Sequence, residues 1–377
     1  MRPLTFWKTF AILAVVVAVL AVYSPARTAG ATSTLVVPTQ YVSIQAAVNA
    51  ASNGDTIKVL PGTYAEQVSI GKNLAIKGSG ALVTTVRAPA VLVPGSLGRA
   101  FLVDIHSGAN VGISGVTLSG PGPDSCAGTR LGAAIKVVEG ATLDLSAARV
   151  LHIHNTPKQD CFHTGTGIAI GDFVAGEIGH ATIHDVRISD YQSNAISVFT
   201  PGSDATITGN VLNAAIGPSD AVSTGGVEVG NGAVARVTYN VVNGNRCSLE
   251  VFCGSDPMTQ SQGAGLLDGP GAPPAAGSEF AHNVVSGNDI GIYMFTGCCN
   301  INHNLVVNNQ FFGIAIQDTT NDVSHDVIIG GQVGVGVIAD AVDSVGTLRG
   351  EVILGTSVAK TKEIACCGFT AKVITLP

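Results

Sequence analysis

A short repeated pattern constrains the fold of this chain more than any other feature of its sequence. The segment Ile301–Ile316 contains two apolar residues five positions apart, then a polar corner, then an alternating Gly-Ile-x-Ile strand. Alternation with a period of two is typical of β-strands, and the Gly, Asn and His residues between them mark sharp bends. Nine apolar pairs have this five-residue spacing: Ile113/Leu118, Leu145/Val150, Ile183/Ile188, Ile207/Leu212, Val237/Val242, Phe280/Val285, Ile301/Val306, Val323/Ile328 and Leu348/Ile353.

The spacing between repeats indicates a solenoid. The copies that begin at Phe280, Ile301 and Val323 follow one another after 21 and 22 residues. A period in the low twenties with three short strands per repeat is typical of stacked coils. One coil buries little apolar surface alone, so the coils must stack, about 4.8 Å apart, to form one continuous core. We therefore predict an all-β, parallel solenoid of about ten coils.

The composition agrees with a repetitive β structure rather than with disorder. The 377-residue chain is 46% hydrophobic and only 12% charged, and it contains 47 glycines. These values favour a large core with many turns. The net charge of -7 and the lack of a basic run give no reason to expect nucleic acid as a partner.

Residues 1–31 have the pattern of a secretory signal peptide. Arg2 and Lys8 precede an apolar run, Phe10–Val22, that is short for a membrane span, and an Ala-Gly-Ala sequence at 29–31 offers a cleavage site. We expect a secreted domain over 32–377, extracellular or periplasmic, without membrane contact after cleavage. An uncleaved membrane anchor is the alternative.

Eight cysteines in an exported chain favour disulfides. Cys126 and Cys161 lie in comparable loops of adjacent repeats, so stacking would bring them together. Cys247 and Cys253 could close one loop. The partners of the adjacent cysteines at 298–299 and 366–367 stay open. Zinc is the alternative, but no Cys-x-x-Cys or Cys/His ligand spacing supports it.

The opening of the mature chain carries a resemblance to a known superfamily. Ser43–Ala51 has apolar residues at helical spacing, which predicts a short helix that caps the open end of the solenoid. Residues 43–70, SIQAAVNAASNGDTIKVLPGTYAEQVSI, resemble the opening segment of right-handed parallel β-helix proteins of the pectin lyase-like superfamily, including pectinesterases. The resemblance implies a single-stranded right-handed parallel β-helix, and it covers the later coils by pattern.

The catalytic blocks of pectinesterases are not intact in this chain. Gly171–Gly176 resembles the family's D-F-I-F-G block and Gln317–Thr319 resembles its Q-D-T-L block, but their order is reversed and no L-G-R-P-W block is present. Asp172 and Asp318 fall about five coils apart, roughly 24 Å at strand spacing. They cannot act on one carbon, so ester hydrolysis of this kind is disfavoured.

Two polar columns run along the predicted coils. The position before the second apolar strand predicts a ladder of stacked side chains, at Asn210, Asn240, Asn283, Asn304 and Asp326. A second column holds Tyr239, His282, His303 and His325. Three stacked imidazoles could bind a transition metal. Gly and Asp share this column at Gly115, Asp185 and Gly209, and these residue types tolerate positive φ, so bend residues are the favoured interpretation.

Long corners before the Gly-Ile-x-Ile strands mark the candidate site, because loops carry function more often than the scaffold does. They span 119–133, 151–166, 213–225 and 243–264 and would form a wall beside that sheet. Candidate catalytic residues on these loops and on the outward face of the sheet are Asp160, His163, His154, Glu228 and Lys136. Candidate substrate-binding residues are Arg130, Lys158, Phe199, Tyr293 and Phe295.

Each candidate has a chemical reason. His154, Asp160 and His163 suit proton transfer or a metal. Glu228, paired with Asp160 or Asp172 two coils away, lies near the limit of about 10 Å for glycoside hydrolysis. Lys136, together with Lys158 and Arg130, suits a lyase, which needs a base and a cation for a uronate's carboxylate. The aromatic residues could stack on sugar rings.

Two classes of function follow from these features. The first is a secreted polysaccharide lyase or glycoside hydrolase, which rests on fold-level analogy. The second is a non-catalytic extracellular protein, structural, adhesive or glycan-binding. Both have a polysaccharide or cell-surface glycan as partner. No carboxylate cluster marks a calcium site. The sequence assigns no metal ligand and leaves any cofactor open.

Overall fold

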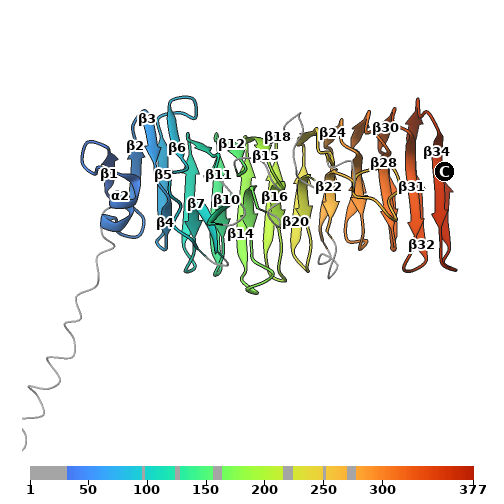
Figure 1. The fold of residues 1–377 in the computed structure, drawn as a ribbon, viewed down its shortest axis with the longest axis horizontal. Helices are drawn as coiled ribbons and strands as arrows, with labels where there is room; N and C mark the ends of the chain where they lie inside the picture. The colour runs from blue at the N-terminus through green and yellow to red at the C-terminus, as the bar shows by residue number, and fades with distance from the viewer. Residues whose placement is uncertain are drawn as a thin grey trace, which may run out of the picture. The chain divides into compact units, whose positions relative to one another are not determined.

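The computed structural model describes residues 32–95, 98–123, 128–155, 164–214, 224–248, 252–269 and 277–377. The chain divides into two units, Met1–Thr32 and Ser33–Pro377, and the second contains the elements of the fold. Within the described residues this unit contains one α-helix and 35 strands, which form three sheets. Figure 1 shows the strands following one another in a single row of coils.

The three sheets are named A, B and C here, with their strands given in spatial order. Sheet A contains β1 (Thr34–Val37), β2 (Thr56–Val59), β5 (Leu74–Gly78), β8 (Asn110–Ser114), β11 (Ala141–Ser146), β14 (Gly179–His184), β17 (Asp204–Thr208), β20 (Val234–Thr238), β23 (Glu279–Ala281), β26 (Asn300–Asn302), β29 (Thr320–Ser324), β32 (Ser344–Arg349) and β35 (Ala371–Leu376). Sheet B contains β3 (Gly62–Ala65), β6 (Thr84–Arg87), β9 (Thr117–Ser119), β12 (Arg149–Ile153), β15 (Arg187–Tyr191), β18 (Val211–Asn213), β21 (Val241–Asn243), β24 (Val284–Ser286), β27 (Leu305–Val307), β30 (Val327–Ile329) and β33 (Val352–Leu354). Sheet C contains β4 (Val68–Ile70), β7 (Arg99–Ile105), β10 (Arg130–Val137), β13 (Thr166–Ile170), β16 (Asn194–Val198), β19 (Gly225–Val229), β22 (Ala264–Asp268), β25 (Ile290–Met294), β28 (Phe312–Gln317), β31 (Val333–Ala339) and β34 (Ala359–Ala365).

Every strand pairs in parallel with its equivalent in the next coil, which confirms the predicted parallel β-helix. Ile301 pairs with Val323 in sheet A, and Val306 pairs with Ile328 in sheet B, so the repeats stack in register. The nine apolar pairs lie in the core and are buried, except for the partly buried Ile353 near the C-terminal end. The sheets have 13, 11 and 11 strands. The coils at the N-terminal end lack the spacing motif, so the number of motif copies is smaller than the number of strands in each sheet.

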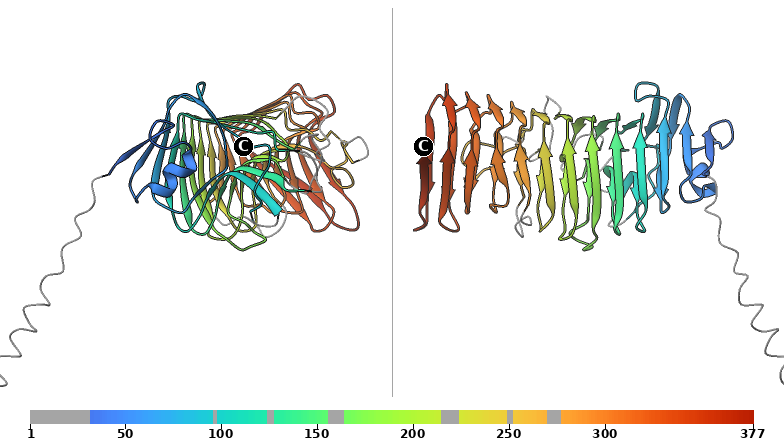
Figure 2. Two further views of the ribbon diagram at one scale, coloured as in Figure 1. Left: turned by 60° about the vertical axis from the view of Figure 1, so that its left-hand side comes forward. Right: turned by 180° about the vertical axis from the view of Figure 1, so that it is seen from behind.

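The predicted capping helix is α2 (Ile44–Ala50), at the end of the stack beside β1 and β2 (Figure 2). Ser43 caps it, because its hydroxyl accepts the backbone N–H of Ala46. The Glu66 carboxylate accepts the N–H groups of Ile44 and Gln45, both at 2.9 Å. Ile44 and two further apolar residues of the helix are buried. The helix therefore covers the first coil, as the sequence predicts.

The asparagine ladder is present and a second one accompanies it. Asn210, Asn240, Asn283, Asn304 and Asp326 are buried, and each amide donates to the side-chain oxygen of the next member at 2.9–3.1 Å. The second ladder runs through Asn245, Asn288 and Asn309, each pair joined at 2.9 Å. Both ladders bond coil to coil inside the protein.

The histidine column consists of bend residues, as favoured above. His282, His303 and His325 have φ of 57°, 55° and 60°, and Gly115 and Asp185 share the positive φ. The rings of neighbouring histidines stack with centroids 5.1 Å apart, and Tyr239 stacks on His282 at 4.9 Å. The column therefore has a structural role at the corner between sheets A and B.

The long corners lie between sheets B and C, where the sequence places them. The chain from β9 to β10, from β12 to β13, from β18 to β19 and from β21 to β22 is much longer than the link from β27 to β28. Parts of these corners, including Cys126, Lys158, Asp160, Cys161 and His163, lie outside the described residues. The predicted Cys126–Cys161 bond therefore stays a prediction.

Candidate functional site

The outer face of sheet C carries a column of side chains in register. Asp104 of β7 pairs with Lys136 of β10, and the column continues through β13 and β16 to Glu228 of β19. It then becomes apolar, with Leu267 pairing with Tyr293. From Asp104 to Tyr293 there are six strand steps, or about 29 Å at strand spacing. The polar part of the face is therefore its N-terminal half.

Three neighbouring cavities follow this face and together form what we call the groove. The central cavity has a volume of about 430 Å³ and is lined by Lys136, Asp172 and Glu228, among others. A cavity of about 290 Å³ on its N-terminal side shares Phe101 and Lys136 with it. A cavity of about 330 Å³ on its C-terminal side shares Ser193, Asn194 and Glu228 with it. Shared lining residues make the groove continuous along the stack.

A buried ion pair lies in the central cavity. The Lys136 ammonium contacts Asp172 Oδ2 at 2.9 Å and donates to the Gly171 carbonyl, also at 2.9 Å. Each of the two charged side chains is only 8% exposed. Lys136 comes from β10 and Asp172 from the corner that follows β13, so the pair links adjacent coils.

The local backbone holds Asp172 in place. Its Oδ1 accepts the N–H groups of Val174 and Ala175 at 3.0 and 3.2 Å, in a turn closed by main-chain bonds between Asp172 and Glu177. The turn begins at Gly171, which has a φ of 75°. A Cβ there would lie 2.0 Å from the Phe199 carbonyl oxygen, so only glycine fits. The chain thus fixes this carboxylate beside Lys136.

The surroundings shift the pKa values of both partners. Burial lowers the pKa of Lys136, and the Asp172 carboxylate opposes this only in part. Burial alone would raise the pKa of Asp172, but the Lys136 ammonium and the two N–H donors outweigh it and lower that pKa overall. Asp172 is therefore ionised at neutral pH, and Lys136 loses its proton more easily than an exposed lysine.

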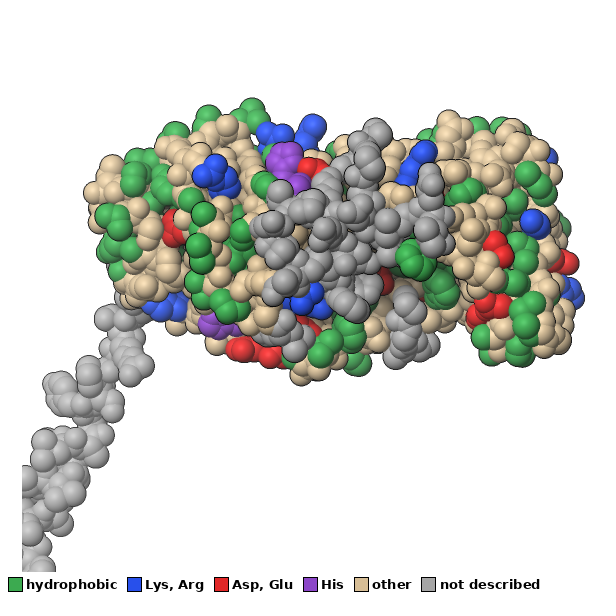
Figure 3. All heavy atoms as spheres, in the orientation of Figure 1, with side chains coloured by type: hydrophobic (Ala, Val, Ile, Leu, Met, Phe, Trp, Pro, Cys, Tyr) green, Lys and Arg blue, Asp and Glu red, His purple; other side chains and the backbone are tan. Residues whose placement is uncertain are grey.

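Further charged and aromatic side chains complete the central cavity. Arg99 and Glu228 both line it, and the Glu228 Oε2 accepts the Asn194 amide at 2.6 Å. The Phe173 and Phe199 rings meet edge to face with centroids 5.6 Å apart. Apolar and charged side chains of both signs are also interspersed on the face of the molecule shown in Figure 3. The central cavity thus offers flat apolar walls with a few fixed polar groups, as small-molecule and sugar sites do.

The predicted site residues fall into three places. Lys136, Glu228 and Phe199 line the central cavity. Tyr293 and Phe295 line the C-terminal cavity with rings 4.4 Å apart, but Tyr293 is buried and its hydroxyl bonds Gln317. Arg130 pairs in register with Arg99 on β7 but is not among the lining residues. His154 lies outside the groove, just after β12.

Sequence reasoning missed several members of the site. Arg99 and Phe101 belong to β7, which the repeat pattern did not identify as a strand of this sheet. The sequence relates Asp172 only to Glu228 and to Asp318, as a possible second carboxylate, and gives no indication that it contacts Lys136. The available signal was the Gly-Asp turn that directly follows a Gly-Ile-x-Ile strand, one coil after Lys136.

The described cysteines form two bonds. Cys247 and Cys253 are joined, as predicted, with Cα atoms 5.4 Å apart. Cys298 and Cys299 are joined to each other, which resolves one pairing that the sequence left open. Cys366 and Cys367 are free thiols.

Comparison with known proteins shows a shared fold. No family model matches the sequence. No curated protein sequence matches it either. Among solved structures, the alginate lyase from Paenibacillus sp. str. FPU-7 is similar over 89% of this chain and 99% of its own, with a TM-score of 0.52 and 11% identity. The GH136 lacto-N-biosidase from Eubacterium ramulus is similar over 88% of this chain and 64% of its own, with a TM-score of 0.54 and 10% identity.

These likenesses bear on the fold and not on a family. At 10–11% identity they support the parallel β-helix fold alone, and the resemblance to pectinesterases gains no support. Within the described residues, no helix is long and apolar enough to cross a membrane. The chain thus has a parallel β-helix fold, which it shares with the alginate lyase and the lacto-N-biosidase.

Proposed function

We propose that this protein cleaves an acidic polysaccharide by β-elimination, with the substrate lying along the groove and Lys136 acting as the base. The observation that carries the proposal is the buried Lys136–Asp172 pair in the central cavity of a groove that is continuous over six strand steps. The fold similarity to an alginate lyase supports this class of substrate by analogy.

The groove suits an extended chain of sugars. Its cavities follow one another along the stack, so a linear polymer can contact all three. Phe101, Phe173 and Phe199 offer flat apolar surface for sugar rings in the central cavity. Arg99 lines the same cavity, and its guanidinium suits a uronate carboxylate.

The reaction assigns one role to each central residue. The neutral Lys136 amine removes the C5 proton of a uronate, the C5–H electrons form the C4–C5 double bond, and the C4–O bond breaks. The departing oxygen takes a proton from water, and Arg99 stabilises the charge that develops on the carboxylate. Asp172 positions Lys136. The lowered pKa of Lys136 increases the fraction of free amine available for this step.

Glycoside hydrolysis is the second candidate, and one observation favours it. Asp172 and Glu228 line the same cavity on coils two steps apart, which is about 9.6 Å along the stack at strand spacing. An inverting glycosidase has its carboxylates about 6.5–9.5 Å apart, so the separation along the stack lies at the upper limit of that range. In this mechanism Asp172 would activate water and Glu228 would protonate the leaving oxygen.

The test is a screen of the purified protein on acidic and neutral polysaccharides, following both unsaturated-product absorbance and reducing ends. Unsaturated product that is lost in Lys136→Met and kept in Lys58→Met supports elimination, because Lys58 is an exposed lysine on sheet A. Reducing ends without unsaturated product would select hydrolysis. Binding without turnover on any substrate would select the non-catalytic, glycan-binding or adhesive alternative.

Secretion is part of the same proposal. Residues 1–31 act as a signal peptide, and residues 32–377 are the mature extracellular or periplasmic domain. The bond between Cys247 and Cys253 supports an oxidising compartment. Mass spectrometry of the exported protein would show a mature N-terminus near Thr32, and an intact N-terminus in the membrane fraction would contradict it.

A further inference from the structure

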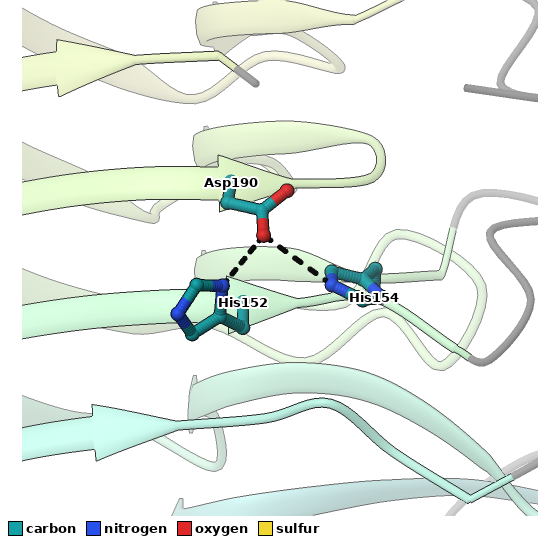
Figure 4. Close-up of side chains that lie close together, drawn as sticks. All are labelled: His152, His154 and Asp190. Carbon is teal, nitrogen blue, oxygen red and sulfur yellow. Dashed lines mark hydrogen bonds and ion pairs between the residues drawn. The ribbon is translucent and has the colours of Figure 1, made fainter. Parts of the chain in front are cut away.

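Two histidines and an aspartate converge where strands β12 and β15 of sheet B end (Figure 4). None of the three is among the residues that line the groove. His152 Nδ1 lies 2.6 Å from Asp190 Oδ2, and His154 Nε2 lies 3.4 Å from the same oxygen. One ligand atom from each residue lies within 4.8 Å of the others. Three potential metal ligands therefore face one point.

The backbone at this place takes an unusual conformation. Leu151 pairs with Ser189 and Ile153 with Tyr191, so His152 and Asp190 occupy equivalent positions on β12 and β15. Both have a φ of 57°, in the left-handed region that residues with a Cβ rarely adopt. The bend residues His282, His303 and His325 share this conformation, so it marks a bend in each strand, and the two bends bring the side chains together across adjacent coils.

The second ring nitrogen of His154 is fixed in the way that metal-binding histidines are. Its Nδ1 lies 2.9 Å from the Asn155 carbonyl oxygen, which can only accept, so Nδ1 carries the hydrogen. With Nδ1 as the donor, Nε2 faces the Asp190 carboxylate, and either a proton or a metal ion between them can join the two groups. A backbone carbonyl on the far nitrogen is the usual second partner of a ligating histidine.

We propose that His152 Nδ1, His154 Nε2 and Asp190 Oδ2 bind a Zn²⁺ ion. Imidazole and carboxylate ligands suit this ion, and tetrahedral bonds of about 2.1 Å place ligand atoms about 3.4 Å apart. His154 and Asp190 already have that separation. The His152 side chain is 53% exposed, so it has room to move outward. Its Nδ1 hydrogen transfers through water to Nε2, and the net charge of the ring does not change.

The ion would join two coils at the corner between sheets B and C. The described residues supply three ligands, and a tetrahedral ion takes a fourth, such as water. The site does not depend on the proposed function, since none of its ligands lines the groove. It extends the sequence interpretation, which assigned no metal ligand and did not include Asp190.

The test is titration of the untagged, chelator-treated protein with Zn²⁺ by calorimetry, after the free thiols of Cys366 and Cys367 have been alkylated. One ion should bind per chain, and Co²⁺ should give the absorption bands of a low-symmetry site. Asp190→Asn and His154→Ala should each weaken Zn²⁺ binding at least about tenfold. His184→Ala is the matched control, because His184 also lies beside two aspartates but has no second histidine.

Three outcomes would overturn the proposal: no binding by the wild-type protein, equal binding by Asp190→Asn and the wild type, or equal loss in His184→Ala. Asp190→Asn keeps the size of the side chain and an oxygen for His152, so it tests the site even where His154→Ala does not fold. A rise in melting temperature with Zn²⁺ that is absent in Asp190→Asn would support the link between the coils.

Discussion

At the scale of single residues, the Lys136–Asp172 pair contains the charges on which the proposed reaction depends. Each partner changes the protonation of the other, because both are nearly buried and lie 2.9 Å apart. Asp172 keeps Lys136 protonated to a higher pH than burial alone would allow. The pH dependence of the reaction should therefore report on this contact.

Replacement of Asp172 by Asn should move the activity towards lower pH. Without the carboxylate, burial lowers the pKa of Lys136 further, so the amine is free at lower pH and the rising limb of kcat/KM against pH shifts in that direction. Lys136→Met should reduce kcat by about 10²–10⁴-fold at every pH. A complete loss of activity in Asp172→Asn, with no shifted profile, would favour the hydrolase role for Asp172.

A second buried carboxylate ends the first asparagine ladder. Asp326 accepts the Asn304 amide, its Oδ2 is buried without a hydrogen-bond partner, and its N–H faces Glu351. Burial raises the pKa of Asp326 to about 7, and burial together with Asp326 raises that of Glu351 to about 8. In the folded state both carboxyl groups keep their protons up to about pH 7 and pH 8, whereas in the unfolded state they lose them near pH 4.

Asp326→Asn should stabilise the protein at alkaline pH. A carboxyl group whose pKa is raised in the folded state stabilises the protein fully below about pH 4, and this contribution is lost as the pH rises through about 7. The stability of the wild-type protein should therefore fall between pH 5 and pH 8. The amide cannot ionise, so the variant should gain about 1–3 kcal/mol at pH 8 and little at pH 5. Urea unfolding at both pH values checks this, with the exposed Asp322→Asn as a control.

At the scale of elements, side-chain hydrogen bonds inside the core join the successive coils from Asn210 to Asp326. Asn283 illustrates this: its oxygen accepts the Asn240 N–H and amide, and its own amide donates to the Val237 carbonyl and to Asn304. The hydrogen bond from the Asn283 amide to the Val237 carbonyl crosses to the preceding coil, so one side chain links two neighbouring coils of the solenoid.

Asn283→Ala should cost more than an ordinary core truncation. It leaves several buried polar groups without partners, each worth about 1–3 kcal/mol, so we expect a loss of at least about 3 kcal/mol. Asn110→Ala should change stability by less than about 0.5 kcal/mol, because Asn110 is exposed on sheet A. Denaturant unfolding of both variants measures the difference. Similar values for the two would contradict a stabilising ladder.

At the scale of the whole protein, the groove is longer than any one side chain cluster. Phe295 lines the C-terminal cavity, several coils from Lys136, and can meet only the far part of a bound chain. Phe295→Ala should therefore weaken kcat/KM for long oligosaccharides and leave the shortest cleaved substrates unchanged, because remote contacts supply binding energy only to substrates that reach them. An equal loss for all lengths would place Phe295 near the reacting sugar or in the fold.

The sequence predicted the fold in much more detail than the site. The apolar spacing identified the stacked coils, the capping helix, one ladder and the bend residues, because each depends on short-range patterns. Lys136 and Glu228 were found because they interrupt an apolar strand. The partnership of Lys136 with Asp172, and of His154 with Asp190, depends on side chains that meet across coils 36 residues apart in the chain. No local pattern reports such contacts.

The stacking of coils also makes the protein modular along its length. Each strand of the three sheets pairs only with the equivalent strands before and after it. The groove residues lie on strands β7–β25, whereas Ile301–Ile316 belongs to coils beyond them. A second copy of the 22-residue coil that begins at Ile301 would therefore lengthen the stack by one coil beyond the groove and leave the groove intact. Proteins of this design can change their length by whole coils while their chemistry stays in place.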